Sequence, residues 1–509
     1  MASNMCSDMR QFFPGAGSNC LHVLFPVLLC VQMVFCFSPL AAEAENLTIA
    51  VGRDFYDGSD SRSFLHGSTN TWEGLTWLDK NLHAVPWLAQ SWQSADEGRQ
   101  WTFFIRKDVL FHDGTRMSNA DVAAAVQRII AYPRYDPTGC YQSVISVRAQ
   151  GTEEVVFQLK EPVPYFPKLT AYYSSPVIKP SCIDAQGRIT NLIGTGPYKV
   201  SRILPGDRIE LTAFDRYWGG KALYEKVVFR TVTDAHSRLL SLMAGETDAV
   251  ADVGAILPEQ AGEIRRHPDL ILKQVQVATT HLLIFNSRIP PFSQAENRVW
   301  FAGLLDRDGL IAAFAKDAGI PAYDPYVPFS KDFAFGLIRP EPKPFPRCFS
   351  EKQIIILLNQ ATLQRWPYAE MAQVMQEMLR SHGIAAKIET RETGAWQEAL
   401  KSGRFHMAVQ PYTLMTGDPD FFYAYWIASD APGNCGWKDA QTDRLVRNAR
   451  HEMDAGKRKE LYRQLAEKIR DQLPLLPLYH DVSLYACRKQ AGEFEMDHLF
   501  RPCLTEKMP

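Results

Sequence analysis

The fold class is decided by the stretch QIIILLNQATLQRWPYAEMAQVMQEMLRSHGIAAKIETRETGAWQEALKSGRFHMAVQ, residues 353–410. Three strand-like runs alternate here with two helix-like ones: Ile354–Leu358, Tyr368–His382, Ala385–Thr390, Trp396–Lys401 and Phe405–Gln410. In the first helix-like run the apolar side chains recur at helical spacing on one face, at Met371, Val374, Met375, Met378 and Leu379. Alternation of strand and helix predicts a mainly parallel sheet with right-handed crossovers, which is an α/β fold.

Similar signals extend in both directions from this stretch. Strands are predicted toward the N-terminus at Leu47–Val51, Trp101–Ile105, Val155–Leu159, Tyr198–Ile203, Arg208–Phe214 and Lys226–Val232. Ser118 can cap a helix with its hydroxyl, and Asp121 places a negative side chain in the first turn of that helix. A late helix is predicted at Arg458–Leu473, ended by Pro474. The segment 321–346, rich in proline and aromatic residues, is predicted to be an extended surface excursion.

The N-terminus has the pattern of a cleavable secretory signal. An apolar run from Leu21 to Phe37 is followed by small residues with an Ala-x-Ala pattern that ends at Ala44. A membrane anchor is the alternative, but spanning a bilayer takes about 20 apolar residues, and this run is shorter and is broken by Pro26 and Gln32. We therefore expect residues 1–44 to be removed and the mature chain to be soluble.

The cysteines beyond this signal form no Cys-x-x-Cys pair, which weighs against a metal site or a thioredoxin-type motif. They are Cys140, Cys182, Cys348, Cys435, Cys487 and Cys503. An even number permits disulfides in an oxidising compartment. We expect either a Cys487–Cys503 disulfide in the C-terminal tail or buried thiols.

Charge and motifs exclude several function classes. The net charge of −2 gives no reason to expect nucleic acid or an anionic membrane as partner. The sequence has no Gly-x-Ser-x-Gly elbow, no His-Glu-x-x-His, no Walker A loop and no Gly-x-Gly-x-x-Gly. His112-Asp113 and His480-Asp481 are isolated pairs rather than parts of a catalytic constellation. We therefore expect no enzyme activity, no cofactor and no bound metal.

A series of short motifs runs through nearly all of the mature chain. They are Pro86–Trp92 (PWLAQSW) followed by Trp101-Thr102-Phe103, Val109–Gly114 (VLFHDG), Gly194–Tyr198 (GTGPY) followed by Tyr217-Trp218-Gly219, Gly403-Arg404-Phe405, Asp418–Phe422 (DPDFF) and Pro474–Pro477. In this order they resemble the family 5 extracytoplasmic solute-binding proteins of ABC importers, the peptide- and nickel-binding group. The motifs identify the scaffold and not the ligand, because Trp87, Trp92 and Trp101 are expected in the core. Gly194 and Gly196 are expected to allow backbone angles forbidden to other residues.

The resemblance implies a two-lobed α/β protein with the type II periplasmic-binding-protein fold and an extra subdomain in its first lobe. Lobe I would comprise residues 45–280, with the extra subdomain at about 76–190, and lobe II residues 281–475. Residues 476–509 would return to lobe I as a C-terminal tail. A solute would bind in the cleft between the lobes, and hinge closure would bury it.

The same resemblance implies a periplasmic, monomeric protein that hands a small solute to the membrane permease subunits of an ABC importer. A short peptide is the solute we favour, and nickel or a metal chelate is the alternative within this class. A secreted hydrolase that uses dispersed carboxylates is an alternative from another class, as is a chemoreceptor or chaperone partner on the same fold.

Three positions bear on the solute. In peptide-binding relatives an aspartate ahead of the Asp-Pro element pairs with the peptide ammonium, and Met415 falls at that place here. In nickel-binding relatives aromatic residues occupy the same loop, where this chain has Thr413 and Gly417. An arginine that meets ligand carboxylates in the nickel-type proteins falls near Arg134, and the planar guanidinium suits that task.

The candidate ligand-binding residues lie on loops, because binding groups are commonly held on loops by a rigid frame. They are Tyr56, Asp57, Trp72, Arg134, Tyr172, Tyr173, Thr413, Met415 and Asp418. Packing, solvent exposure or turn formation is the competing interpretation for each of them.

Overall fold

The structure is a computed structural model, and it describes residues 46–52, 70–136, 139–171, 176–338, 344, 353–491 and 494–506. All of these lie in one compact unit, Glu43–Pro509. The predicted signal lies outside the described residues. No helix in the described ranges combines the length and the apolar composition that crossing a bilayer requires.

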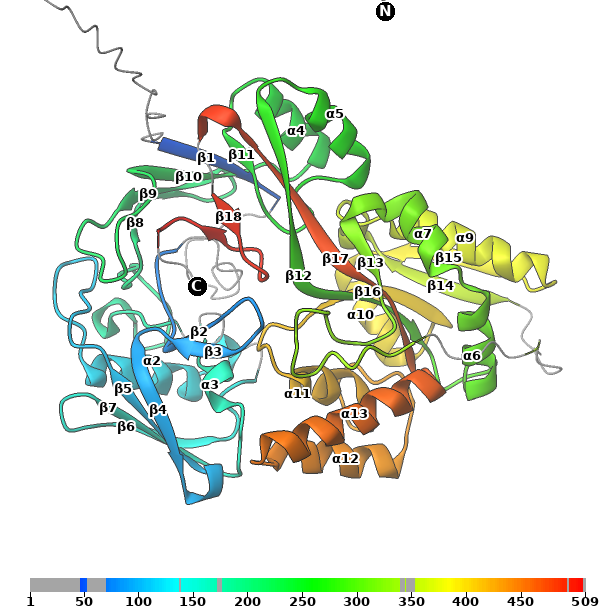
Figure 1. Cartoon of the computed structure of the whole chain (residues 1–509), viewed down its shortest axis with the longest axis horizontal. Helices are drawn as coiled ribbons and strands as arrows, with labels where there is room; N and C mark the ends of the chain where they lie inside the picture. Colours follow the sequence, from blue (N-terminus) through cyan, green and yellow to red (C-terminus); the bar gives the residue numbers. More distant parts are fainter. Residues whose placement is uncertain are drawn as a thin grey trace, which may run out of the picture. The chain divides into compact units, whose positions relative to one another are not determined.

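Most strands of the described residues join one mixed sheet of eleven (Figure 1). Its order is β15 (Ala386–Arg391), β14 (Ile354–Asn359), β16 (Met407–Thr413), β12 (Leu270–Phe285), β17 (Leu475–Arg488), β11 (Ala249–Val250), β1 (Asn46–Val51), β10 (Lys226–Thr231), β9 (Arg208–Ala213) and β8 (Tyr198–Leu204), with β13 (Gly319–Pro321) paired to β17. The parallel block predicted from residues 353–410 is confirmed, because β14 lies between the parallel strands β15 and β16. The sheet as a whole is mixed, since β12 pairs antiparallel with both β16 and β17.

The long strands β12 and β17 run side by side through the middle of the sheet (Figure 1). Their register shifts between Gln276 and Thr280, so that the extra residues of β12 leave the ladder. There the amide of Ala278 donates to the carbonyl of His498 at 2.8 Å, and its carbonyl accepts from the amide of Leu414 at 2.7 Å. This irregular segment therefore ties the middle of the sheet to the C-terminal tail and to the loop after β16.

Beyond that irregularity, both faces of β12 are buried. Ala278, Leu282 and Ile284 pack in one hydrophobic core, whereas Leu283 and Phe285 pack in another. Alternate side chains of a strand point to opposite faces of a sheet, so this one strand supplies both cores.

A separate four-stranded sheet has the order β4 (Ala89–Ala95), β5 (Gln100–Ile105), β7 (Glu154–Leu159) and β6 (Val144–Gln150). Helix α2 (Asn119–Ala131) contacts β6 and β7. The predicted cap is confirmed: Ser118 and Asp121 form a capping box at the start of α2. Two small hairpins complete the strands, β2 (Thr76–Leu78) with β3 (Ala84–Pro86) and β18 (Glu495–Met496) with β19 (Pro502–Cys503).

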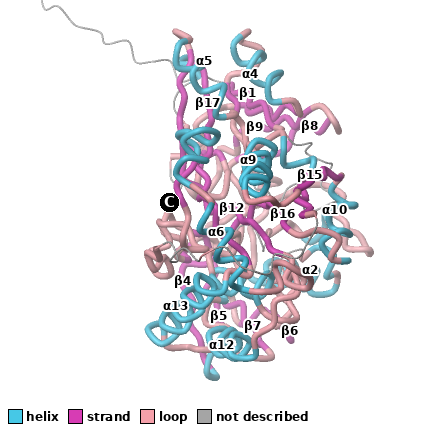
Figure 2. Tube along the Cα trace, turned by 90° about the vertical axis from the view of Figure 1, so that its right-hand side faces the viewer, coloured by secondary structure: helices cyan, strands magenta, loops and turns pink. Residues whose placement is uncertain are grey.

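The remaining α-helices of the described residues connect or cover these strands (Figure 2). They are α3 (Phe166–Leu169), α4 (Ala235–Met243), α5 (Ala261–Arg266), α6 (Ala295–Leu304), α7 (Arg307–Leu310), α8 (Gln360–Leu363), α9 (Tyr368–Ser381), α10 (Thr393–Ser402), α11 (Pro419–Phe422), α12 (Ala440–His451) and α13 (Ala455–Gln472). Helices α12 and α13 pack against each other. The predicted late helix corresponds to α13, which starts three residues earlier than expected.

Residues of two of the sequence motifs, Trp87 of PWLAQSW and Tyr217 and Trp218 of the later motif, surround a buried carboxylate. Glu73 accepts hydrogen bonds from Trp87 Nε1 at 2.7 Å, from the Tyr217 hydroxyl at 2.7 Å and from Trp218 Nε1 at 3.1 Å. Burial raises the pKa of Glu73 to about 7, against the opposing effect of these hydrogen bonds. Trp87 and Trp101 are core residues, as expected, while Trp92 is half-buried.

Three local expectations are corrected. Gly194 and Gly196 do not have positive φ, and they are needed because the chain passes close to Thr71 and Asn70: a Cβ at Gly196 would lie 2.3 Å from the Asn70 carbonyl oxygen. The described part of the 321–346 segment is not a surface excursion, since Tyr326 and Phe333 pack in the core. Cys487 and Cys503 are both thiols and form no disulfide.

Candidate functional site

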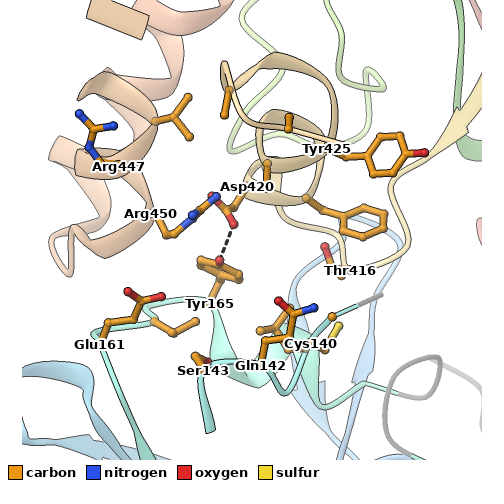
Figure 3. A pocket seen from close by; sticks show the side chains of 18 of the residues that line it. Cys140, Gln142, Ser143, Glu161, Tyr165, Thr416, Asp420, Tyr425, Arg447 and Arg450 are labelled. Atoms are coloured by element: carbon orange, nitrogen blue, oxygen red, sulfur yellow. Dashed lines mark hydrogen bonds and ion pairs between the residues drawn. The ribbon is translucent and has the colours of Figure 1, made fainter. Parts of the chain in front are cut away.

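A pocket of about 610 Å³ lies between the segments 136–169 and 416–450 (Figure 3). Its volume is in the range of small-molecule sites. One wall comes from the residues around β6, β7 and α3, and the other from α11, the loop that follows it and α12. Residues as far apart in the sequence as Asp136 and Arg450 thus face one cavity.

Helix α12 presents one face to this pocket. Its start is fixed by Asp439, whose side chain accepts from the amide of Thr442 at 2.9 Å. From there Asp443, Val446, Arg447 and Arg450 recur at helical spacing, and all of them line the pocket. Asp443 also accepts from the amide of Ser429 at 2.9 Å, which ties α12 to the loop after α11.

A polar bridge joins the two walls of the pocket. The Tyr165 hydroxyl donates to Asp420 Oδ2 at 2.6 Å, and Arg450 Nε donates to Asp420 Oδ1 at 3.0 Å (Figure 3). Burial and the charge of Asp420 raise the pKa of Tyr165, so its hydroxyl keeps the proton that it donates. Burial lowers the pKa of Arg450, but Asp420 outweighs this effect, so the arginine remains charged.

Below this bridge lies a buried ion pair that holds the loop before α11. Arg458 donates to both carboxylate oxygens of Asp418, at 2.9 and 2.6 Å. Burial opposes ionisation of Asp418, but Arg458 outweighs burial and lowers the pKa of that carboxyl. Asp418 also caps α11, and Lys168 donates to the carbonyl of Gly417 at 2.9 Å. These interactions therefore hold in place the loop that contains Thr416 and the start of α11, which contains Asp420.

Two charged side chains of the lining have no hydrogen bond or ion pair with any described residue. They are Asp430, on the loop after α11, and Arg447, on α12. Aromatic surface lies on the same wall: Phe421 is half-buried, and the side chain of Tyr425 is 41% exposed. The pocket thus offers a carboxylate, a guanidinium and aromatic faces to a ligand.

The sequence-predicted site residues that the structure describes do not line this pocket. Trp72 lies in the core with 1% of its surface exposed. Arg134 is exposed, donates to the carbonyl of Gln186 and lies over the Tyr135 ring at 4.7 Å. The Thr413 hydroxyl pairs with that of Thr279 at 2.7 Å. Met415 is half-buried, and Asp418 is fully buried against Arg458.

The other four candidates, Tyr56, Asp57, Tyr172 and Tyr173, lie outside the described residues. The segment predicted to carry ligand contacts does reach the pocket, but through Thr416, between two of the predicted positions, and through Asp420 in the first turn of α11. The Asp-Pro-Asp motif was the available signal for Asp420. No sequence motif marks Tyr165, Asp430 or Arg447.

Among the described residues, no group of three or more His, Cys, Asp or Glu side chains is placed to hold a metal ion. The histidine pairs noted in the sequence are structural. His480 is buried in β17, pairs with the Thr280 hydroxyl at 2.9 Å and has a pKa that burial lowers to about 3. His112 interacts with the backbone of Gly194 and Gly196, and burial lowers its pKa to about 4.

The fold matches solved structures along almost its whole length. NikA from Brucella suis in complex with Fe(III)-EDTA covers 89% of this chain and 97% of its own, with a TM-score of 0.79 at 21% identity. The periplasmic binding protein DppA from Helicobacter pylori, in complex with the peptide STSA, covers 91% and 98%, with a TM-score of 0.73 at 20% identity. These likenesses confirm the predicted α/β periplasmic-binding-protein fold.

Curated relatives match over similar lengths. A di/tripeptide-binding protein of Pseudomonas aeruginosa is 26% identical over 95% of this chain and 95% of its own length. The dipeptide-binding protein of Escherichia coli is 26% identical over 82% of this chain and 84% of its own. The sequence profile of the bacterial extracellular solute-binding proteins, family 5 middle region, matches residues 83–434. The chain therefore belongs to the family 5 bacterial extracellular solute-binding proteins.

Proposed function

We propose that this protein captures a short peptide in the pocket between 136–169 and 416–450 and delivers it, chemically unchanged, to the permease subunits of an ABC importer. The observation that carries the proposal is a pair of opposite charges on one wall, Asp430 and Arg447. Neither side chain has a hydrogen bond or ion pair with any described residue. A peptide has an ammonium group and a carboxylate, and a guanidinium binds a carboxylate in bidentate geometry. The peptide-binding names of the two curated relatives point the same way.

The proposal includes a division into lobes. Lobe I would comprise residues 45–280, with the four-stranded sheet in the extra subdomain at about 76–190, lobe II residues 281–475, and the tail residues 476–509. The chain would then pass between lobes in β12 and β17, whose register shifts near Gln276–Thr280 supply a place for bending. The two pocket walls would belong to different lobes, so bending would open and close the pocket.

The same proposal places the protein in the periplasm as a monomer, with residues 1–44 removed as a secretory signal. Membership of an extracellular solute-binding family agrees with export. Mass spectrometry of the protein purified from a periplasmic fraction tests this directly. A mature N-terminus at Glu45 is expected, and an intact N-terminus would contradict it.

Identification of the natural solute tests the binding role. Freshly purified protein is denatured and the released small molecules are identified by mass spectrometry. The refolded protein is then titrated by calorimetry with di- and tripeptides, free amino acids and nickel–histidine mixtures. Binding of a short peptide, recovered intact after incubation, is the expected result. Preferential binding of the nickel chelate would favour the metal alternative, and peptide cleavage would favour the hydrolase alternative.

A further inference from the structure

We propose that the pocket selects peptides that carry a net positive charge, an inference that rests on the proposed function and specifies its substrate class. The lining contains five carboxylates and two guanidiniums. The carboxylates are Asp136, Glu161, Asp420, Asp430 and Asp443, and the guanidiniums are Arg447 and Arg450. A neutral zwitterion would leave this excess of negative charge uncompensated when the pocket closes around it.

The two guanidiniums are not equivalent. Arg450 is already paired with Asp420, at 3.0 Å, and that pair is neutral as a unit. Arg447 has no partner among the described residues and is the cation left to bind the carboxylate of a peptide. Once Arg447 and a ligand carboxylate are paired, the rest of the lining is anionic.

The other four carboxylates differ in whether they already accept hydrogen bonds from the protein. Asp136 accepts from the amides of Cys140 and Tyr141, at 2.9 and 2.8 Å, and Asp443 from the amide of Ser429. Both carboxylates therefore already accept hydrogen bonds from the backbone.

The remaining two carboxylates are available to a ligand. Glu161 is exposed, and its carboxylate lies 3.6 Å from His451 Nε2. Asp430 has no partner among the described residues. These two carboxylates can accept hydrogen bonds from the ammonium group of a peptide and from a second cationic group on the same peptide.

Aromatic side chains complete the chemistry that recognises organic cations. Tyr425 and Phe421 line the pocket from the segment that also contributes Asp430. Tyr165 comes from the other wall and lies next to Asp420 (Figure 3). An ammonium or guanidinium over an aromatic face is attracted by the ring quadrupole, and the attraction increases when water is excluded. The hydrophobic stem of a lysine or arginine side chain can cover the exposed Tyr425 ring while its charged end reaches a carboxylate.

Three dipeptides of matched size test the charge selection: Ala-Lys, Ala-Gln and Ala-Glu. Calorimetric titration at low and physiological salt is expected to give Ala-Lys about tenfold tighter binding than Ala-Gln, equivalent to about 1.4 kcal/mol. Ala-Glu is expected to bind weakest. The preference for Ala-Lys over Ala-Gln is expected to narrow as salt is raised, because exposed charges are screened.

Substitutions locate the effect. Asp430→Asn is expected to reduce the preference for Ala-Lys over Ala-Gln to about threefold, weakening Ala-Lys more than Ala-Gln, because it removes one of several negative charges that face the ligand. Asp215→Asn removes an exposed carboxylate that does not line the pocket, and it is expected to change neither affinity. Thermal melting of both variants establishes that they are folded, since Asp430 and Asp215 are exposed.

The outcomes separate the two proposals. Equal affinity for all three dipeptides, or tightest binding of Ala-Glu, would overturn the charge selection and leave the peptide-binding function standing. An unchanged Ala-Lys preference in Asp430→Asn would also overturn the assignment of this pocket wall. Failure of all three dipeptides, and of longer peptides, to bind would overturn the proposed function itself.

Discussion

The phenol of Tyr165 donates a 2.6 Å hydrogen bond to Asp420, a residue 255 positions further along the chain. This contact joins the two walls of the pocket, because Tyr165 precedes α3 and Asp420 lies in α11. It can form only when the walls are as close as they are in this structure. The hydrogen bond therefore reports how close the two walls of the pocket lie.

Tyr165→Phe is expected to weaken peptide binding about tenfold. A hydrogen bond to a charged group contributes about 1.5–3 kcal/mol, and about 1.4 kcal/mol corresponds to a factor of ten in Kd. Calorimetric titration of the best-binding peptide measures the effect. Tyr132→Phe is the matched control, because its hydroxyl donates to the carbonyl of Ala185 away from the pocket. Equal peptide affinity of the Tyr165 and Tyr132 variants would contradict a contribution of the Tyr165–Asp420 hydrogen bond to peptide binding.

Arg458→Met is expected to lower the free energy of unfolding by about 3–5 kcal/mol, because Asp418 would remain buried without its charged partner. Arg463→Met, on the same helix, removes exposed pairs with Glu460 and Glu467 and is expected to change the free energy of unfolding much less, because solvent screens these pairs. Urea unfolding of the two variants measures both quantities. Similar losses in both would show that the buried pair is no more important than a surface one.

Glu73 is expected to make stability fall as pH rises. Its pKa is about 7 in the folded protein against 4.5 for an ordinary glutamate, so between these values the folded state binds more protons than the unfolded state. Its contribution is greatest below pH 4.5 and is lost as pH rises through 7. Relative to Glu73→Gln, the wild type should lose about 3 kcal/mol across this window, at about 1.36 kcal/mol per pKa unit. A pH-independent difference between the two proteins would refute this assignment.

Gly196→Ala is expected to destabilise the protein strongly, because its Cβ would lie 2.3 Å from a backbone oxygen that cannot move aside alone. Gly262→Ala places a Cβ on α5, where no atom lies within 4 Å apart from the adjacent residues and the backbone of the helix itself. It is expected to be neutral or to stabilise by up to about 1 kcal/mol, since alanine favours helix. Thermal melting compares the pair. A mild effect at Gly196 would contradict the close approach.

The sequence correctly predicted those elements whose signals come from a few neighbouring residues. The alternation around Ile354–Asn359 and the Ser118–Asp121 capping box depend on nearby residues only, and both are confirmed. Strands β12 and β17 were not predicted, because their most buried stretches are apolar or mixed on both faces and show no alternation. Tyr326 was expected on the surface because the sequence around it is rich in proline, a composition typical of exposed segments. Its ring is nevertheless buried in the core.

The candidate site was less predictable than the fold. The DPDFF motif does not distinguish Asp418 from Asp420. In the structure Asp418 forms a buried ion pair with Arg458, whereas Asp420 lines the pocket. That difference depends on a residue 40 positions away and on the turn of α11, neither of which the spacing reveals. The bridge from Tyr165 spans still more of the chain, and only the folded arrangement identifies it.

The two-faced burial of β12 limits how this protein can vary over evolution. Just before Leu282, inserting or deleting a single residue would move Leu282, Leu283, Ile284 and Phe285 each into the other core. Ile284 would then occupy the space shaped for Phe285. Length changes here must come in twos, so we expect homologous sequences to keep gaps out of this segment even where the surrounding loops have drifted freely.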